Sequence, residues 1–159
     1  MGKKTTKTPK SYMQNARDRT GLTREEAADR LCMNARTLGS YELRESPIPR
    51  ETLVQASDMY SDPYLLTDYC AYDCPIGKRL GMEPANRTPL AGISKRLTAY
   101  ILGMSEMHKM LIALSYDNKI DKSEEHELAI ILDTLGKMKH DITELESVSR
   151  LYYITSSKT

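Results

Sequence analysis

Apolar residues recur every three or four positions along most of this 159-residue chain, and no segment alternates apolar and polar residues in the manner of a strand. The first spacing is that of a helix with one buried side. Short helical patterns, bounded by capping and turn residues, fill residues 11–74, and two longer patterns fill residues 90–152. The sequence therefore predicts an all-α protein, with a domain of five short helices followed by a long antiparallel helical hairpin.

The clearest helix boundaries lie between residues 21 and 42. Thr23 and Glu26 have the spacing of a capping box, which begins a helix at the next residue. Asn34 is a favoured N-cap, and it begins a second helix after a turn of about three residues. Two short helices joined by such a turn are typical of a helix-turn-helix motif, whose second helix reads DNA.

At these residues the chain resembles the Xre family of Cro- and phage-repressor-like regulators, whose pattern is approximately GxTQEELAxxxGVSxxTISxxExG. The resemblance extends from Met13 to Leu66 and covers well under half of the chain. It implies a helix-turn-helix DNA-binding domain over residues 11–74. The residues that match the pattern are Leu22, Thr23, Glu25, Glu26, Ala28, Leu31, Thr37, Leu38 and Glu42.

Several residues depart from the family pattern, and Leu43 and Arg44 stand where a helix-ending glycine is common. Cys32 stands where the family has glycine, in a turn that tends toward positive φ. Gly39 lies inside the predicted recognition helix, on its outward side, and we expect it to weaken that helix by about 1 kcal/mol relative to alanine.

The predicted recognition helix presents short or polar side chains, which suit close approach to base edges. Arg36 is expected to donate to guanine, because a guanidinium matches its two major-groove acceptors. Arginines at the ends of the helices are expected to hold phosphates by charge. The expected base contacts are Asn34, Ala35, Arg36 and Ser40, and the expected phosphate contacts are Arg24, Thr37 and Arg44.

The net charge of +1 is unevenly distributed along the chain. Residues 1–50 hold 11 lysines and arginines against 6 aspartates and glutamates, whereas residues 101–159 hold 7 against 10. A basic N-terminal part suits DNA, because phosphate contacts dominate affinity. Four lysines fall in residues 1–10, which we expect to form a disordered basic arm that either follows the phosphate backbone or is only a solvated tail.

Residues 75–89 contain three prolines and two glycines, which predicts a linker in which Gly77 and Gly81 are turn residues. Beyond it, apolar residues alternate three- and four-residue steps, the spacing of a coiled-coil seam. The predicted seam consists of Leu90, Ile93, Leu97, Tyr100, Met104, Met107, Leu111 and Leu114, and then of Leu128, Ile131, Leu135, Met138, Ile142, Leu145 and Tyr152.

Further apolar residues widen the buried stripe beyond what one facing helix covers; these are Ile101, Ile112, Leu132 and Leu151. We therefore expect a homodimer through residues 90–152, with two hairpins forming a four-helix bundle. The alternative is that the hairpin folds back on the N-terminal domain within a monomer. Residues 153–159 are expected to be a tail.

Other chemistry is not supported by the sequence. Cys70 and Cys74 have the spacing of two zinc ligands, but no matching pair follows. His126 and Glu127 begin a zinc-protease pattern, yet Ile130 stands where the second histidine belongs. We expect no metal, no cofactor and no enzymatic activity. The chain lacks an apolar run of about 20 residues, so we expect no membrane span and a cytoplasmic location.

The sequence thus favours a sequence-specific regulator of transcription that binds double-stranded DNA as a dimer, most simply a repressor. One alternative stays open at this point. A protein-interaction adaptor, such as an antitoxin-like modulator, would keep the helix-turn-helix shape and use the C-terminal hairpin to hold another protein.

Overall fold

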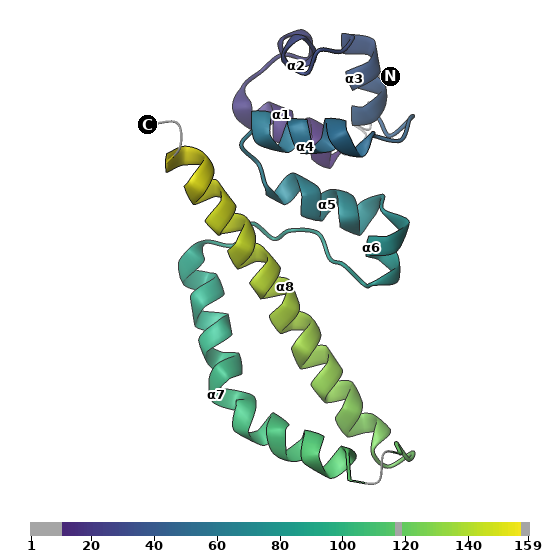
Figure 1. Ribbon diagram of the computed structural model, residues 1–159, viewed down its shortest axis with the longest axis vertical. Coiled ribbons are helices and arrows are strands. Elements are labelled where there is room, and N and C mark those ends of the chain that lie inside the picture. Colours follow the sequence, from purple (N-terminus) through teal and green to yellow (C-terminus); the bar gives the residue numbers. More distant parts are fainter. Residues whose placement is uncertain (1–10, 117–118, 157–159) are drawn as a thin grey trace, which may run out of the picture. The chain divides into compact units, whose positions relative to one another are not determined.

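The computed structural model describes residues 11–116 and 119–156, and within them every regular element is an α-helix (Figure 1). The predicted fold class is confirmed, because short N-terminal helices precede a long antiparallel pair. The predicted arm, residues 1–10, and the end of the tail lie outside the described residues. The helices are α1 Tyr12–Thr20, α2 Arg24–Arg30, α3 Ala35–Glu42, α4 Arg50–Met59, α5 Tyr64–Tyr72, α6 Pro75–Arg79, α7 Leu90–Leu114 and α8 Glu125–Ser156.

The chain divides into two compact units, and residues 11–85 belong to the first of them. In this unit α1 packs against α3 and α5, α2 packs against α3, and α4 packs against α5. Met13, Leu38 and Leu65 are completely buried where these helices meet. Ala27 and Ala28 are also buried, and their small side chains let α2 lie close to its neighbours.

Helices α2, α3 and α4 end in the same way, with one residue in the left-handed conformation. These residues are Cys32, Arg44 and Ser61, with φ of 52°, 58° and 52°. After α2, the Met33 N–H donates to the Ala28 carbonyl at 2.9 Å, which is the 6→1 bond of a Schellman motif. The expectation of positive φ at Cys32 is confirmed, and the tight turn between α2 and α3 forms without glycine.

The segment expected to be a linker begins instead with a short helix, α6, which packs against α5. Gly77 lies buried inside this helix, so its interpretation as a turn residue is wrong. A Cβ atom at this position would lie 2.1 Å from the Cys70 carbonyl oxygen. The absence of a side chain therefore lets the two backbones touch. Gly81 is a turn residue as predicted, with φ of 63°.

The second unit, residues 86–150, contains α7 and most of α8, which run antiparallel (Figure 1). The predicted restart of helix after residue 120 is confirmed, because the Asp121 N–H donates to Glu124 and the Glu124 N–H donates to Asp121. Ile93, Leu114 and Ile131 are buried as seam residues.

Much of the predicted seam is nevertheless exposed, and at these positions the prediction is wrong. The side chains that lie 37–53% exposed are Leu90, Met104, Leu111, Leu135, Ile142 and Leu145. Polar residues take the buried positions in the second half of α8, where Asp141, Glu144 and Ser147 are all at most 2% exposed. The apolar side of α8 is therefore rotated away from the surface of α8 that contacts α7.

Asp141 is held by an arginine from the other helix of the hairpin. The Arg96 Nε atom donates to both Asp141 carboxylate oxygens at 2.9 Å. Glu144 lies one turn further on, 3.7 Å from Arg96, and accepts a hydrogen bond from the Arg87 backbone N–H. The hydrogen bonds from Arg96 hold the pKa of Asp141 below its usual value. This cluster fixes α7 against α8 by charge rather than by apolar packing.

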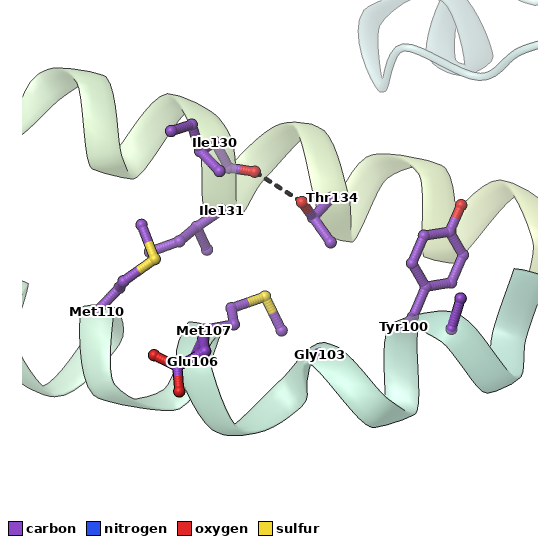
Figure 2. A pocket seen from close by; sticks show the side chains of 9 residues that line it. Tyr100, Gly103, Glu106, Met107, Met110, Ile130, Ile131 and Thr134 are labelled. Atoms are coloured by element: carbon purple, nitrogen blue, oxygen red, sulfur yellow. Dashed lines mark hydrogen bonds between the residues drawn. The ribbon is translucent and has the colours of Figure 1, made fainter.

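A cavity of about 260 Å³ lies between α7 and α8 (Figure 2). Met107 and Met110 line it from α7, and Ile130 and Ile131 line it from α8.

No helix in the described part of the chain is long and apolar enough to cross a membrane.

Replacing Gly77 with alanine tests the contact between α5 and α6. Because the new methyl group overlaps the Cys70 carbonyl, we expect Gly77→Ala to lower the free energy of unfolding by about 1–3 kcal/mol. Gly39→Ala is the matched control, since its Cβ would meet Arg24 at an ordinary 3.5 Å. It should stabilise the protein by up to about 1 kcal/mol. Equal effects of the two substitutions in urea denaturation would contradict the contact.

Acid titration tests the Arg96–Asp141 pair. The lowered pKa means that the pair stabilises the folded hairpin above the unfolded pKa of about 3.9 and that this stabilisation is lost as the pH falls through the folded pKa. Asp141→Asn should therefore destabilise the hairpin at neutral pH and make its unfolding less dependent on pH below about 4. Asp133→Asn, which removes an exposed pair with Lys137, is the control and should change little.

Candidate nucleic-acid interface

The two helices predicted to form a helix-turn-helix motif are α2 and α3, and the turn at residues 31–34 joins them. The capping box of α2 is present, because the Glu26 N–H donates to the Thr23 hydroxyl at 3.2 Å and the Thr23 N–H donates to the Glu26 carboxylate at 2.8 Å. These bonds lower the pKa of Glu26. At the start of α3, the Asn34 side chain accepts from the Arg36 N–H at 2.8 Å. Both predicted caps are thus confirmed.

The predicted base-contacting residues gather at the first turns of α3, but they differ in exposure. Asn34, Arg36 and Thr37 are exposed, whereas Ala35 and Ser40 are half-buried. The Ser40 hydroxyl donates to the Thr37 carbonyl at 2.8 Å, so its oxygen is left as an acceptor. Within the described residues, nothing holds the guanidinium of Arg36, and it remains available to a ligand.

Gly39 does not lie on the outward side of α3, and this prediction is wrong. It is buried beneath the side chain of Arg24, which extends across from α2. A Cβ atom on Gly39 would lie 3.5 Å from the Arg24 Nη1 atom. The small residue therefore gives the arginine a flat surface on which to lie.

Arg24 and Arg17 converge on one carboxylate, that of Glu42 at the end of α3. Arg17 donates from Nε to Oε1 at 2.5 Å and from Nη2 to Oε2 at 3.3 Å, and Arg24 donates from Nε to Oε2 at 3.0 Å. Glu42 is 1% exposed and Arg17 is 8% exposed. The hydrogen bonds to Glu42 raise the pKa of Arg17 further above its usual value. This Glu42 cluster ties α1 and α2 to α3.

The importance of Glu42 was missed by the reasoning from spacing, which gave it only as a match to the family pattern. The available signal was the spacing of Glu42 from Leu38. Glu42 lies one turn after Leu38, so the spacing places a charged residue on the buried side of the helix. Arg24 was predicted to bind phosphate, but the structure engages its Nε atom internally. Its side chain is 38% exposed, so the remaining guanidinium edge still reaches solvent.

Arg44, which follows α3 and is also predicted to bind phosphate, makes contacts inside this unit. Its guanidinium carbon lies 5.2 Å from the ring centroids of both Tyr12 and Tyr72, which stack with an interplanar angle of 10°. Such cation–π contacts use the faces of the guanidinium group and leave its edge free. Tyr12 in turn donates a hydrogen bond to Asp73. Arg44 is thus positioned apart from the first turn of α3.

The basic excess near the motif comes mainly from outside the described residues. Residues 11–50 carry seven arginines against six acidic residues, and the four lysines of residues 1–10 supply the rest. Of the six acidic residues, Glu42 is neutralised by two of the arginines. The exposed positive charge closest to the start of α3 is that of Arg36.

The described residues contain no group of three or more histidine, cysteine or acidic side chains that could hold a metal ion. Cys70 and Cys74 are both free and half-buried, and burial raises the pKa of the Cys70 thiol. The neighbouring Cys74 raises this pKa further.

Comparisons with protein-family models, with curated proteins and with solved structures found no match for this chain. The function of this chain is therefore inferred from the sequence pattern and from the geometry of these residues. Both concern α2, α3 and the side chains that fix them.

A double-mutant cycle tests the Glu42 cluster. Glu42→Leu removes the carboxylate that pairs with the Nε side of the buried Arg17, which keeps only its Nη1 contacts with Asp18 and the Leu22 carbonyl, so we expect it to lower the free energy of unfolding by up to about 3–5 kcal/mol. Arg17→Met leaves the Glu42 carboxylate with only Arg24 and should also destabilise. The double variant should lose clearly less than the sum, with a coupling of about 0.5–3 kcal/mol in urea denaturation. Additive losses would show that the two side chains do not interact.

Proposed function

We propose that this protein is a sequence-specific regulator of transcription that binds double-stranded DNA and acts most simply as a repressor. In this proposal α3 is the recognition helix and lies in the major groove, and the protein acts as a dimer. The two recognition helices would then read half-sites about 34 Å apart, one helical turn of DNA.

The observation that carries the proposal is the exposure of the side chains in the first two turns of α3. Asn34, Arg36 and Thr37 are exposed there and no described residue pairs with the Arg36 guanidinium, while the opposite side of the same helix is held by Leu38 and Glu42. A rigid helix with an exposed arginine suits a base edge, because the backbone that presents the guanidinium loses little freedom on binding and only the arginine side chain has to be ordered.

The predicted contacts have different roles in this proposal. Arg36 donates to a guanine edge, and Asn34 and Ser40 offer polar atoms to neighbouring bases. Ala35 is half-buried, so it contributes close approach rather than a hydrogen bond. Thr37, together with the free edges of Arg24 and Arg44, contacts phosphates, and the lysines of residues 1–10 add charge that is independent of sequence.

The test begins with selection of duplexes from a random library, followed by measurement of affinity for the selected site and for unrelated DNA at several salt concentrations. We expect Arg36→Ala to weaken binding to the selected site by about 1–3 kcal/mol and to relax preference at one base pair. Arg79→Ala removes the same charge from α6, outside the motif, and should have little effect on that preference.

Two outcomes would contradict the proposal. Failure to enrich any duplex would remove sequence-specific binding altogether. Equal losses for Arg36→Ala on selected and unrelated DNA would place Arg36 at phosphates instead of at a base. Since Arg36 is exposed and unengaged, its replacement should leave the fold intact, and circular dichroism of the variant checks this.

A further inference from the structure

One face of the helical hairpin carries large apolar side chains that nothing in the described residues covers. Ile101 and Ile112 on α7 are 62% and 56% exposed, and Leu132 on α8 is 59% exposed. Three further side chains are about 40% exposed, although their spacing is that of seam residues. We name this surface the apolar outer face, and it consists of Ile101, Leu111, Ile112, Leu132, Leu135 and Ile142.

The geometry of the two helices places the three most exposed of these residues, Ile101, Ile112 and Leu132, on one side of the hairpin, and Leu111, Leu135 and Ile142 lie between them and the seam. Viewed along α7, Ile101 is rotated by roughly a quarter of a turn from the buried Ile93. Viewed along α8, Leu132 is rotated by a similar angle from the buried Ile131. Both rotations have the same sense when each helix is followed from its N-terminus to its C-terminus. Because the helices are antiparallel, the same sense brings both stripes to the same face. The cavity of Figure 2 opens on the opposite face, since Gly103 and Ile130 are displaced in the other sense.

We infer that a second copy of this chain covers the apolar outer face. The two-fold axis runs along the hairpin, so that α7 of each copy packs against α8 of the other. In this orientation the two apolar outer faces meet along their whole length. Each helix then has antiparallel neighbours, as in a four-helix bundle.

The size of the face fits such a dimer. The 25 residues of α7 span about 37 Å, and two helices side by side are about 20 Å wide, which gives a footprint of about 750 Å². Stable protein interfaces bury about 800 Å² on each partner. The footprint of this face is therefore close to what a stable dimer buries on each partner.

Charge does not oppose the pairing of identical hairpins. Residues 86–150 carry nine basic and ten acidic side chains, so two copies are close to neutral toward each other. The six residues of the apolar outer face are uncharged, and the buried Asp141 is paired with Arg96. An identical face supplies the matching apolar surface.

This inference deepens the dimer of the proposed function by assigning it a surface, but its test uses the protein without DNA. The molar mass of the full chain is measured by light scattering during gel filtration over a range of concentrations. We expect a mass twice the 18.1 kDa of the chain. DNA binding and dimerisation can then fail independently of each other.

Two adjacent residues provide matched variants. Ile101→Lys places a charge in the apolar outer face, whereas Leu102→Lys places the same charge on a neighbouring residue that is 78% exposed and points away from that face. Because both side chains are exposed, neither change should unfold the hairpin, and circular dichroism verifies the helix content. We expect Ile101→Lys to weaken dimerisation by at least about tenfold, a change of 1.4 kcal/mol. Leu102→Lys should remain a dimer.

Leu132→Lys repeats the test on α8 and should also weaken the dimer. A monomeric wild-type chain at all concentrations would overturn the inference. So would equal weakening by Ile101→Lys and Leu102→Lys, or a dimer that tolerates both Ile101→Lys and Leu132→Lys, because the second copy would then be bound elsewhere.

Discussion

The orientation of α3 depends on a single buried carboxylate. Glu42 accepts hydrogen bonds from Arg17 on α1 and Arg24 on α2, so one charged group joins three helices that also share the apolar core around Met13, Ala28 and Leu38. A buried carboxylate is costly to remove from water unless it is paired. Arrangements in which α3 rotates or slides would break this pairing, and the same interaction that holds the last turn of α3 thus directs its first turn toward solvent.

The hairpin is organised by a different balance of forces. Its charged residues Arg96 and Asp141 lie between the helices, while several of its leucines and isoleucines lie outside. This is the reverse of what an isolated pair of helices would adopt in water, because apolar area left exposed contributes no stabilisation. In the proposed dimer, burial of those side chains against an identical hairpin would resolve the imbalance and would supply the second copy of α3 that a palindromic DNA site requires.

The helix boundaries were predictable wherever a side chain closes the end of a helix locally. Thr23, Glu26 and Asn34 cap α2 and α3 as their spacing indicates, and positive φ at Cys32 followed from its position in the turn. These features depend on residues within a few positions of each other. The all-α class and the antiparallel pair followed from periodicity for the same reason.

The errors concern contacts between residues that are distant in sequence. Gly39 was placed outward because nothing local shows that Arg24 crosses over it, and Gly77 was taken for a turn residue because its contact is with the backbone of another helix. Leu135 and Ile142 have perfect seam spacing, but their burial depends on which face α7 meets. The predicted DNA contacts follow the same division, since the exposure of Arg36 was foreseen and the internal contacts of Arg24 and Arg44 were not.

The most direct measurement of the central claim is an NMR titration of the isotope-labelled full chain with a duplex enriched by selection. If α3 reads DNA, the largest shifts in backbone amides will fall in residues 34–41 and in the neighbouring turn, while the amides of α7 will change little. Shifts confined to the hairpin, with α3 unchanged at saturation, would contradict the account.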